Sequence, residues 1–140
     1  MRAWTFTVDG IATKRGARPG RGHMHSAPAE VLYEQKVAGA ASDAGLAAGE
    51  GPVSVVIEVW PPDWRRRDLD RLCTAVFDGL KRAGRAALAD DNLRVIRRVT
   101  VSTVAVDPRR PRIRVTVAML CQHPPTLEPY ACSTCGEVVS

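Results

Sequence analysis

The stretch VSVVIEVWPPDWRRRDLDRLCTAVFDGLKRAG, from Val53 to Gly84, carries the strongest secondary-structure signals of the chain. Val53–Trp60 is β-branched and mostly apolar, which predicts a well-buried strand, and the prolines that follow end it. Asp68–Gly84 places apolar side chains at i, i+3, i+4, i+7, i+8 and i+11, which predicts an amphipathic helix with Gly84 suited to its C-terminal cap. We therefore expect a helix that packs on a β-sheet.

Further strand and helix patterns lie on both sides of this stretch. Alternation predicts strands at Trp4–Val8, Arg94–Val106 and Arg112–Cys121, and helical spacing predicts a helix over Pro28–Leu46. The short loop 107–111 between the last two strands is consistent with a β-hairpin. This order of elements predicts an α/β (α+β) fold, with a mixed β-sheet of about four strands and two main helices.

Length and composition agree with one globular domain. The chain has 140 residues, of which 45% are hydrophobic and 25% charged, which excludes a chain that is disordered throughout. It contains no apolar run as long as a membrane span and no signal-peptide pattern, so we expect a cytoplasmic protein. We expect a main domain over residues 1–120 and a small C-terminal tail over 121–140.

The charge points to nucleic acid. There are 20 basic and 15 acidic residues, and only three of the basic residues are lysine. Arginine binds phosphate oxygens through a two-point fork, so an arginine-rich basic domain favours a nucleic-acid partner. A loop of Gly, Pro and basic residues precedes the first predicted helix, and its basic side chains are expected to contact the DNA backbone; the alternative is a solvated loop. These basic side chains are Lys14, Arg15, Arg18 and Arg21. His23 and His25 in this loop have no further metal ligands nearby and are expected to be polar loop residues.

Acidic residues gather around the second predicted helix. Asp68 and Asp70 lie within its first turn, and we expect Asp91, or its neighbour Asp90, to reach the same end of the helix from the following segment. Three carboxylates in one place repel each other unless a hard divalent cation binds them, so this pattern predicts a Mg²⁺ site. The run Arg65–Arg67 places phosphate-binding charge beside it, which favours a nuclease. The alternative is a helix cap and an ion-pair cluster on a solvated surface.

Three of the four cysteines lie in the last 20 residues, close to a histidine. Cys121 and His123 form one pair and Cys132 and Cys135 a second, and two close pairs of such ligands predict a tetrahedral structural Zn²⁺ site. The alternatives are an unstructured tail with free thiols and a redox pair. The fourth cysteine, Cys73, is expected in the core.

The pattern as a whole resembles the RusA-type Holliday-junction resolvases, which are endonucleases carried by many phages and prophages. The most characteristic part is RRRDLDRLCTAVFDGLKRAG, from Arg65 to Gly84, followed by DDNLRV from Asp90 to Val95. The opening strand, the basic loop and Tyr33-Glu34 are similar to the looser start of the family. The resemblance extends over about Trp4–Leu120 and leaves out the cysteine-containing tail.

This resemblance implies a bacterial or phage-encoded homodimer of mixed α/β fold that acts in DNA recombination and repair. It would bind four-way DNA junctions and cut them symmetrically with Mg²⁺ or Mn²⁺. Asp68, Asp70 and Asp91 match the metal-binding catalytic aspartates of the family, and Asp90 matches a flanking acid. Two positions depart from the pattern, because Arg71 stands where the family often has asparagine and Thr74 where it has lysine. Whether Arg71 replaces the phosphate contact of that lysine stays open.

Two other classes of function are compatible with the same residues. One is a non-catalytic zinc-containing protein that binds DNA or RNA through its tail, with the aspartates acting as helix caps. The other is a structural or regulatory dimer. A nuclease would require magnesium or manganese even when it is fully loaded with zinc, whereas the first alternative would be indifferent to magnesium.

Overall fold

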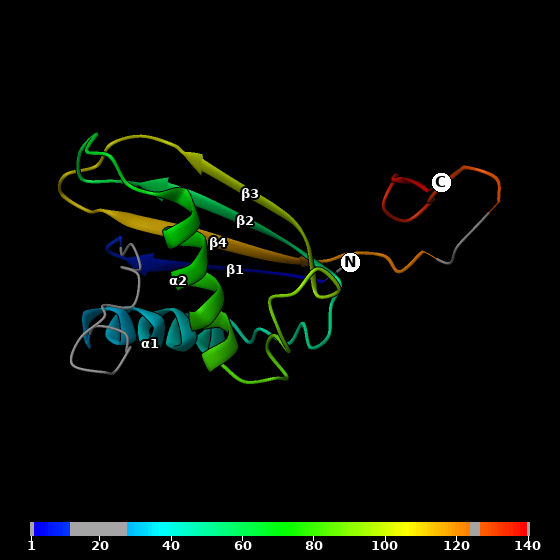
Figure 1. Cartoon of the computed structure of the whole chain (residues 1–140), viewed down its shortest axis with the longest axis horizontal. Helices are drawn as coiled ribbons and strands as arrows, with labels where there is room; N and C mark the ends of the chain where they lie inside the picture. Colours follow the sequence, from blue (N-terminus) through cyan, green and yellow to red (C-terminus); the bar gives the residue numbers. More distant parts are fainter. Residues whose placement is uncertain (1, 12–27, 124–126, 140) are drawn as a thin grey trace, which may run out of the picture.

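The computed structural model describes residues 2–11, 28–123 and 127–139 (Figure 1). A four-stranded sheet with two helices makes up the main body, and a separate two-stranded sheet lies near the C-terminus, so the predicted mixed α/β class is confirmed. No helix in these ranges is long and apolar enough to cross a membrane. The elements are β1 (Ala3–Asp9), α1 (Pro28–Asp43), β2 (Val53–Trp60), α2 (Leu69–Arg82), β3 (Ile96–Thr103), β4 (Arg112–Met119), β5 (Tyr130–Ala131) and β6 (Val138–Val139).

The order of strands in the main sheet is β1-β4-β2-β3, with β2 and β3 parallel and the other pairs antiparallel. The predicted hairpin between β3 and β4 is therefore wrong. Helix α2 crosses from the end of β2 to the start of β3, and such a crossover places the second strand parallel to the first. Strand β4 therefore lies between β1 and β2 and pairs with both, and its residues Val115 and Val117 are fully buried. The more exposed β3 forms one edge of the sheet.

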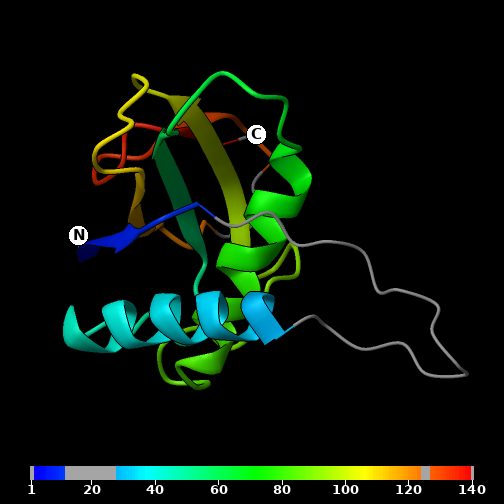
Figure 2. The ribbon, with the colours of Figure 1, turned by 90° about the vertical axis from the view of Figure 1, so that its left-hand side faces the viewer.

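The helices cover one face of the sheet (Figure 2). On that face Val55 and Ile57 of β2 are fully buried, and each such side chain contributes roughly 1.5–3 kcal/mol when it leaves water. On the opposite face Arg114 donates two hydrogen bonds of 2.9 Å to Glu58, and the hydrogen bonding lowers the pKa of that carboxyl. The guanidinium of Arg112 lies 4.3 Å from the ring centre of Trp60 on the same face. The sheet thus has one apolar and one polar face.

A close crossing fixes the two helices against each other. A Cβ added at Gly79 of α2 would lie 2.5 Å from the Cβ of Val37 in α1, so only glycine permits this approach. Nearby, Arg82 Nε donates a 2.9 Å hydrogen bond to Glu34, whose side chain is almost fully buried. Packing and a charged hydrogen bond therefore hold α2 in place over the sheet.

Helix α2 begins beside the ends of β2 and β3 and runs steeply across the sheet toward α1 (Figure 1). Its first turn lies where β2 and β3 end, and its last turn lies beside α1, to which Arg82 is hydrogen-bonded. Gly84, with a φ of +106°, follows the C-cap residue Ala83 and ends the helix as predicted. Residues just before and just after α2 therefore lie at opposite ends of this 14-residue helix.

Candidate metal and DNA-binding sites

Asp68 occupies the N-cap position of α2 but does not act as a cap through its side chain. Its backbone is extended, with φ −83° and ψ 125°, and its carboxylate makes no capping hydrogen bond. The carboxylate is exposed and lies 3.4 Å from Nε of Arg71 one turn along the helix. The capping role that we considered as an alternative is therefore absent, and the carboxylate can bind something outside the helix.

Asp70 follows in the first turn of α2 and is also exposed. Within the described part of the chain no hydrogen bond or ion pair to its carboxylate is found. The hydroxyl of Thr74 donates a 2.8 Å hydrogen bond to the backbone carbonyl of Asp70. Thr74 thus bonds within its own helix and provides no substitute for the lysine of the family pattern.

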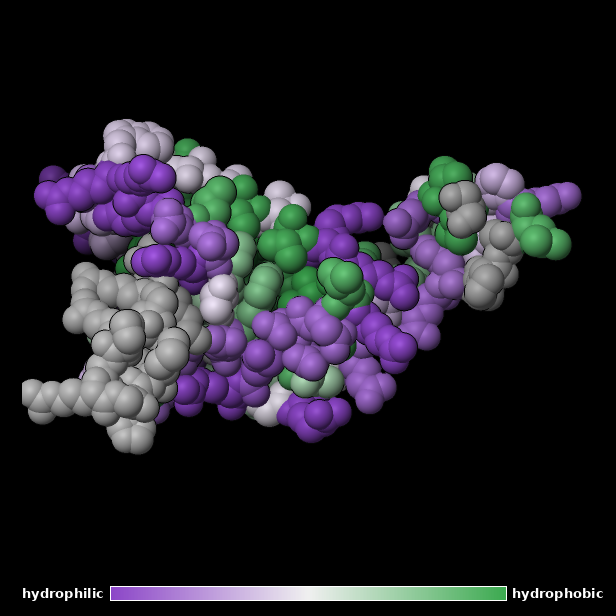
Figure 3. Space-filling view, in the orientation of Figure 1, coloured by the Kyte–Doolittle hydropathy of each residue, from purple (hydrophilic) through white to green (hydrophobic). Residues whose placement is uncertain are grey.

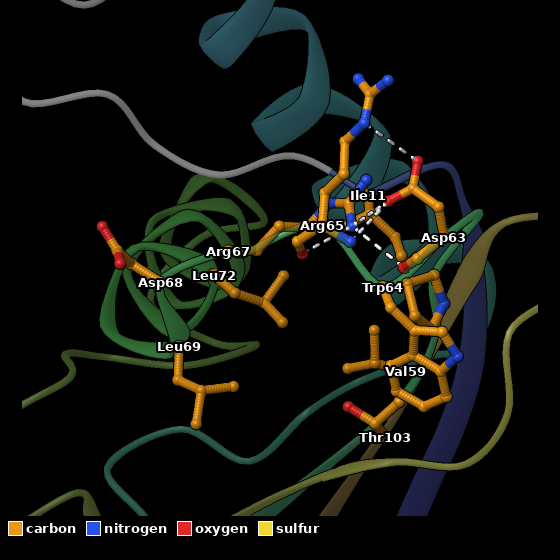
Figure 4. Close-up of a pocket in the computed structure, with 11 residues that line it drawn as sticks. Ile11, Val59, Asp63, Trp64, Arg65, Arg67, Asp68, Leu69, Leu72 and Thr103 are labelled. Atoms are coloured by element: carbon orange, nitrogen blue, oxygen red, sulfur yellow. Dashed lines mark hydrogen bonds and ion pairs between the residues drawn. The ribbon is translucent and has the colours of Figure 1, made fainter.

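The three arginines before α2 do not all have the same partners. Arg67 Nη1 and the backbone N–H of Arg65 each donate a 2.9 Å hydrogen bond to Asp63 Oδ1, and these bonds lower the pKa of Asp63 (Figure 4). Arg66 makes no ion pair with any described residue. Arg66, Arg67 and Arg71 line a hollow of about 310 Å³ together with Asp68. Three guanidinium groups, of which only that of Arg66 has no ion pair among the described residues, therefore meet a carboxylate at one surface.

A second, smaller hollow of about 110 Å³ adjoins the same loop, and Figure 4 shows Trp64 at its edge with the carboxylate of Asp68 turned away from the Asp63 interactions. The side chain of Trp64 is 76% exposed, and that of Leu69 is 59% exposed. Hydrophilic side chains gather around this end of the molecule in Figure 3. Trp64 was not among the predicted site residues, although an aromatic residue beside an arginine run is a typical signal of nucleic-acid contact.

The basic loop that we expect to contact DNA lies outside the described residues. Ile11, which directly precedes residues 12–27, lines the hollow beside Trp64. Ile11, the last described residue before the segment that contains Lys14, Arg15, Arg18 and Arg21, therefore lies next to the start of α2.

The structure does not bring Asp91 to Asp68 and Asp70 within one chain, contrary to our expectation. The Asp91 carboxylate lies 3.4 Å from Nζ of Lys81, in the last turn of α2. Lys81 follows Asp70 by 11 residues, which corresponds to about 16 Å along a helix. No group of three acidic side chains that could share an ion is found in residues 2–11, 28–123 and 127–139. The reason is the parallel pairing of β2 and β3, which places the segment after α2 at the opposite end.

A second acidic group surrounds this end of α2. Lys81 Nζ lies 3.4 Å from both Asp78 and Asp91; burial lowers the pKa of Lys81, but the two carboxylates outweigh burial and the pKa is raised. Asp90 accepts a 2.8 Å hydrogen bond from the backbone N–H of Asp91, and this bond lowers the pKa of Asp90. Asp90 therefore shapes the loop, while the Asp91 carboxylate has Lys81 as its ion-pair partner.

The four predicted zinc ligands lie together in the C-terminal region. One ligand atom from each of the four residues lies within 4.8 Å of the others, and none of the cysteines forms a disulfide. Burial and neighbouring thiols raise the pKa of Cys121 to about 11. Hydrogen bonds from the backbone N–H groups of Cys135 and Thr134 lower the pKa of Cys132 to about 6. The predicted core cysteine, Cys73, is half-buried against the main core.

No family model matches the chain. Curated relatives do match it over 77 residues, and these are named crossover junction endodeoxyribonuclease RusA. The protein of Enterobacteria phage 82 and that of Escherichia coli K12 are each 42% identical, and that of Shigella sonnei is 40% identical. Each match covers 52% of this chain and 62% of the relative. The resemblance to RusA-type resolvases is thus confirmed over about half of the chain.

Proposed function

We propose that this protein is an endodeoxyribonuclease that cuts branched DNA, with the four-way junction as its substrate and Mg²⁺ or Mn²⁺ as its cofactor. The observation that carries the proposal is the exposed pair Asp68 and Asp70 at the start of α2, beside a hollow lined by arginines. The names of the relatives agree with this activity. The net charge of +5 agrees with a polyanionic substrate.

The residues at this end of α2 suit a hard cation and a phosphate. Mg²⁺ is bound in many phosphate-processing sites by one or two carboxylates, with water and phosphate oxygens as the other ligands. Asp68 and Asp70 provide such carboxylates, and the exposed N–H groups of the first turn favour a nearby phosphate. When bound, the metal polarises the phosphodiester and activates water. Arg66 and Arg71 would hold the phosphate oxygens in position.

We further propose that Asp91 completes this site from a second copy of the chain. Within one chain about 16 Å of helix separates its ion-pair partner Lys81 from Asp70, so Asp91 can join the pair only from another copy. A homodimer is consistent with the edge position of β3, which exposes 42% of Val99, and with the neighbouring Leu93, which is 88% exposed. In this arrangement Lys81 would accompany Asp91 into the site.

The proposal is tested with a synthetic four-way junction, incubated with the full-length protein with and without Mg²⁺. We expect symmetric paired nicks that require the metal. Asp70→Asn should abolish cutting and leave junction affinity largely intact, because contacts with phosphates provide most of the affinity. Asp43→Asn, the same change at the exposed end of α1, is the matched control and should cut normally. Cutting by Asp70→Asn at the wild-type rate would exclude the proposed site.

The second candidate is a non-catalytic zinc-containing protein that binds nucleic acid. It is favoured by one observation, namely that in the described ranges only the Cys/His residues form a cluster of metal-ligand atoms within a single chain. Such a protein would bind junctions equally well with and without magnesium and would leave them uncut. Metal-dependent cleavage by the zinc-loaded protein excludes this candidate.

A further inference from the structure

We propose that Cys121, His123, Cys132 and Cys135 bind one structural Zn²⁺, and that Glu137 orients His123 as a ligand of this ion. The site would define a metal-dependent module of residues 121–123 and 127–139, which the RusA resemblance does not include. The proposal concerns stability and metal content, so it is independent of the proposed cleavage activity.

The four ligand atoms of the cluster lie nearly as close together as the ligands of a tetrahedral zinc site. With Zn–S distances of about 2.3 Å and Zn–N distances of about 2.0–2.1 Å, a sulfur and a nitrogen ligand lie about 3.6 Å apart and two sulfurs about 3.8 Å apart. Cys135 Sγ lies 3.4 Å from His123 Nε2, and all four ligand atoms lie within 4.8 Å of one another. One ion at the centre can therefore contact all four with small side-chain shifts.

The backbone between the second pair of ligands already forms a compact turn. The N–H of Gly136 donates a 2.8 Å hydrogen bond to the carbonyl of Cys132, and the N–H of Cys132 donates a bond of the same length to the carbonyl of Glu137. Gly136 has a φ of +73°, which glycine adopts without strain. This turn directs both thiols to the same side, toward the first pair of ligands.

Glu137 lies where a small shift of its side chain would provide the second contact that orients a histidine ligand. Its carboxylate lies 3.8 Å from Nδ1 of His123, while Nε2 of the same ring faces Cys135. Histidine ligands of zinc usually donate their other ring N–H to a carboxylate or carbonyl, which fixes the tautomer and the orientation of the ring. Glu137 is also 3.5 Å from Nη2 of Arg98 in β3, so the module is linked to the edge of the main sheet.

The module has little other means of stability. Its strands β5 and β6 have two residues each, and the side chains of Tyr130 and Val138 are 38% and 68% exposed. Segments of this size without an apolar core usually require disulfides or a metal. Thiolates and imidazole favour Zn²⁺ over Mg²⁺, and four protein ligands leave no position open for water, so the ion would be structural.

The first test is the metal content of the full chain, purified under reducing conditions and without added metal. We expect one zinc per chain in the wild-type protein and in Cys73→Ser, the matched control outside the cluster. The double variant Cys132→Ser/Cys135→Ser should contain almost no zinc. Its main domain should remain folded and should show a cooperative melting transition. The proposal would be overturned if the wild-type protein bound no zinc even after zinc is added. It would also be overturned if a Cys132–Cys135 disulfide persisted in wild-type protein purified under reducing conditions.

The second test addresses Glu137 by competition of the zinc-loaded chain with a chromophoric chelator. We expect Glu137→Gln to bind zinc about 10–100-fold more weakly, and Glu50→Gln, an exposed control, to bind like the wild type. Co²⁺ substitution provides a spectrum that reports tetrahedral thiolate ligation. Equal zinc affinity of the two glutamine variants would refute the role of Glu137, and an octahedral Co²⁺ spectrum would refute the ligand set.

Discussion

The most informative perturbation combines two inactive chains. If Asp91 enters the metal site from a second copy, Asp70→Asn and Asp91→Asn damage different halves of each site. A dimer with one chain of each kind then contains one site with both defects and one site with none. If all three aspartates acted within one chain, both sites of the mixed dimer would remain defective. The mixture therefore distinguishes the two arrangements without a structure of the dimer.

The expected magnitude follows from the geometry. Two oxygen ligands of one Mg²⁺ lie about 3 Å apart, which is far less than the roughly 16 Å that the helix places between Asp70 and Lys81, the neighbour of Asp91. Random pairing of equal amounts of two chains gives about half mixed dimers, each with one intact site, so nicking should return to about a quarter of the wild-type level. Each mixed dimer can cut only one strand.

The assay uses a supercoiled plasmid that extrudes a four-way junction. Paired cuts linearise the plasmid and single cuts relax it to a nicked circle, so the refolded mixture should yield nicked circles whereas the wild type yields linear product. Asp70→Asn mixed with the double variant Asp70→Asn/Asp91→Asn is the control, because no pairing of these chains creates an intact site. If the first mixture is as inactive as this control while refolded wild type cuts, the two-copy site is refuted.

Three further predictions concern DNA contact and the core. Trp64→Ala should weaken junction binding by about 1–3 kcal/mol, the range for loss of one stacked base, and should leave the melting temperature unchanged because the ring is 76% exposed; unchanged affinity in a filter-binding assay would exclude stacking. Gly79→Ala should destabilise the fold by about 1–3 kcal/mol in urea unfolding, through overpacking against α1. Gly39→Ala, where a Cβ meets nothing within 4 Å, should be neutral or stabilising, and a reversed order would contradict the crossing. Replacing three basic residues before α1 with alanine should make the slope of log affinity against log salt shallower by about two to three, and an unchanged slope would show that they do not contact phosphate. The three residues are Lys14, Arg15 and Arg18.

Local patterns predicted most elements of the fold, because periodicity reports which face of a segment is buried. The bounds of β2 agree residue for residue with Val53–Trp60, and α2 begins directly after Asp68 as expected. The strands with which β3 and β4 pair could not be predicted in this way. A short polar loop is compatible with a hairpin, but the burial of β4 on both edges depends on where α2 returns the chain, which is a non-local property.

The same non-local property decided the geometry of the acidic site. Sequence separation placed Asp68 and Asp70 together because one helical turn contains both. Nothing in the spacing of Asp91 shows whether the next strand is parallel or antiparallel to β2, and only the parallel arrangement places Asp91 beside Lys81. Trp64 was missed for a different reason. It is a candidate for nucleic-acid contact because it is exposed at the edge of a hollow, and local sequence does not show that exposure.

If Asp91 enters the metal site from a second copy, the separation of the two acidic groups along α2 would account for the proposed paired cutting. In a two-fold symmetric contact the same surface of each copy meets the other, so two α2 helices that lie antiparallel bring the start of each to the end of its partner. Asp70 of one copy would then meet Asp91 of the second copy, and the symmetry would create the same site twice. A single chain would hold no complete site, and each dimer would hold two. An enzyme built in this way could begin to cut only after dimerisation, and it would always present two sites to the two strands of a symmetric junction.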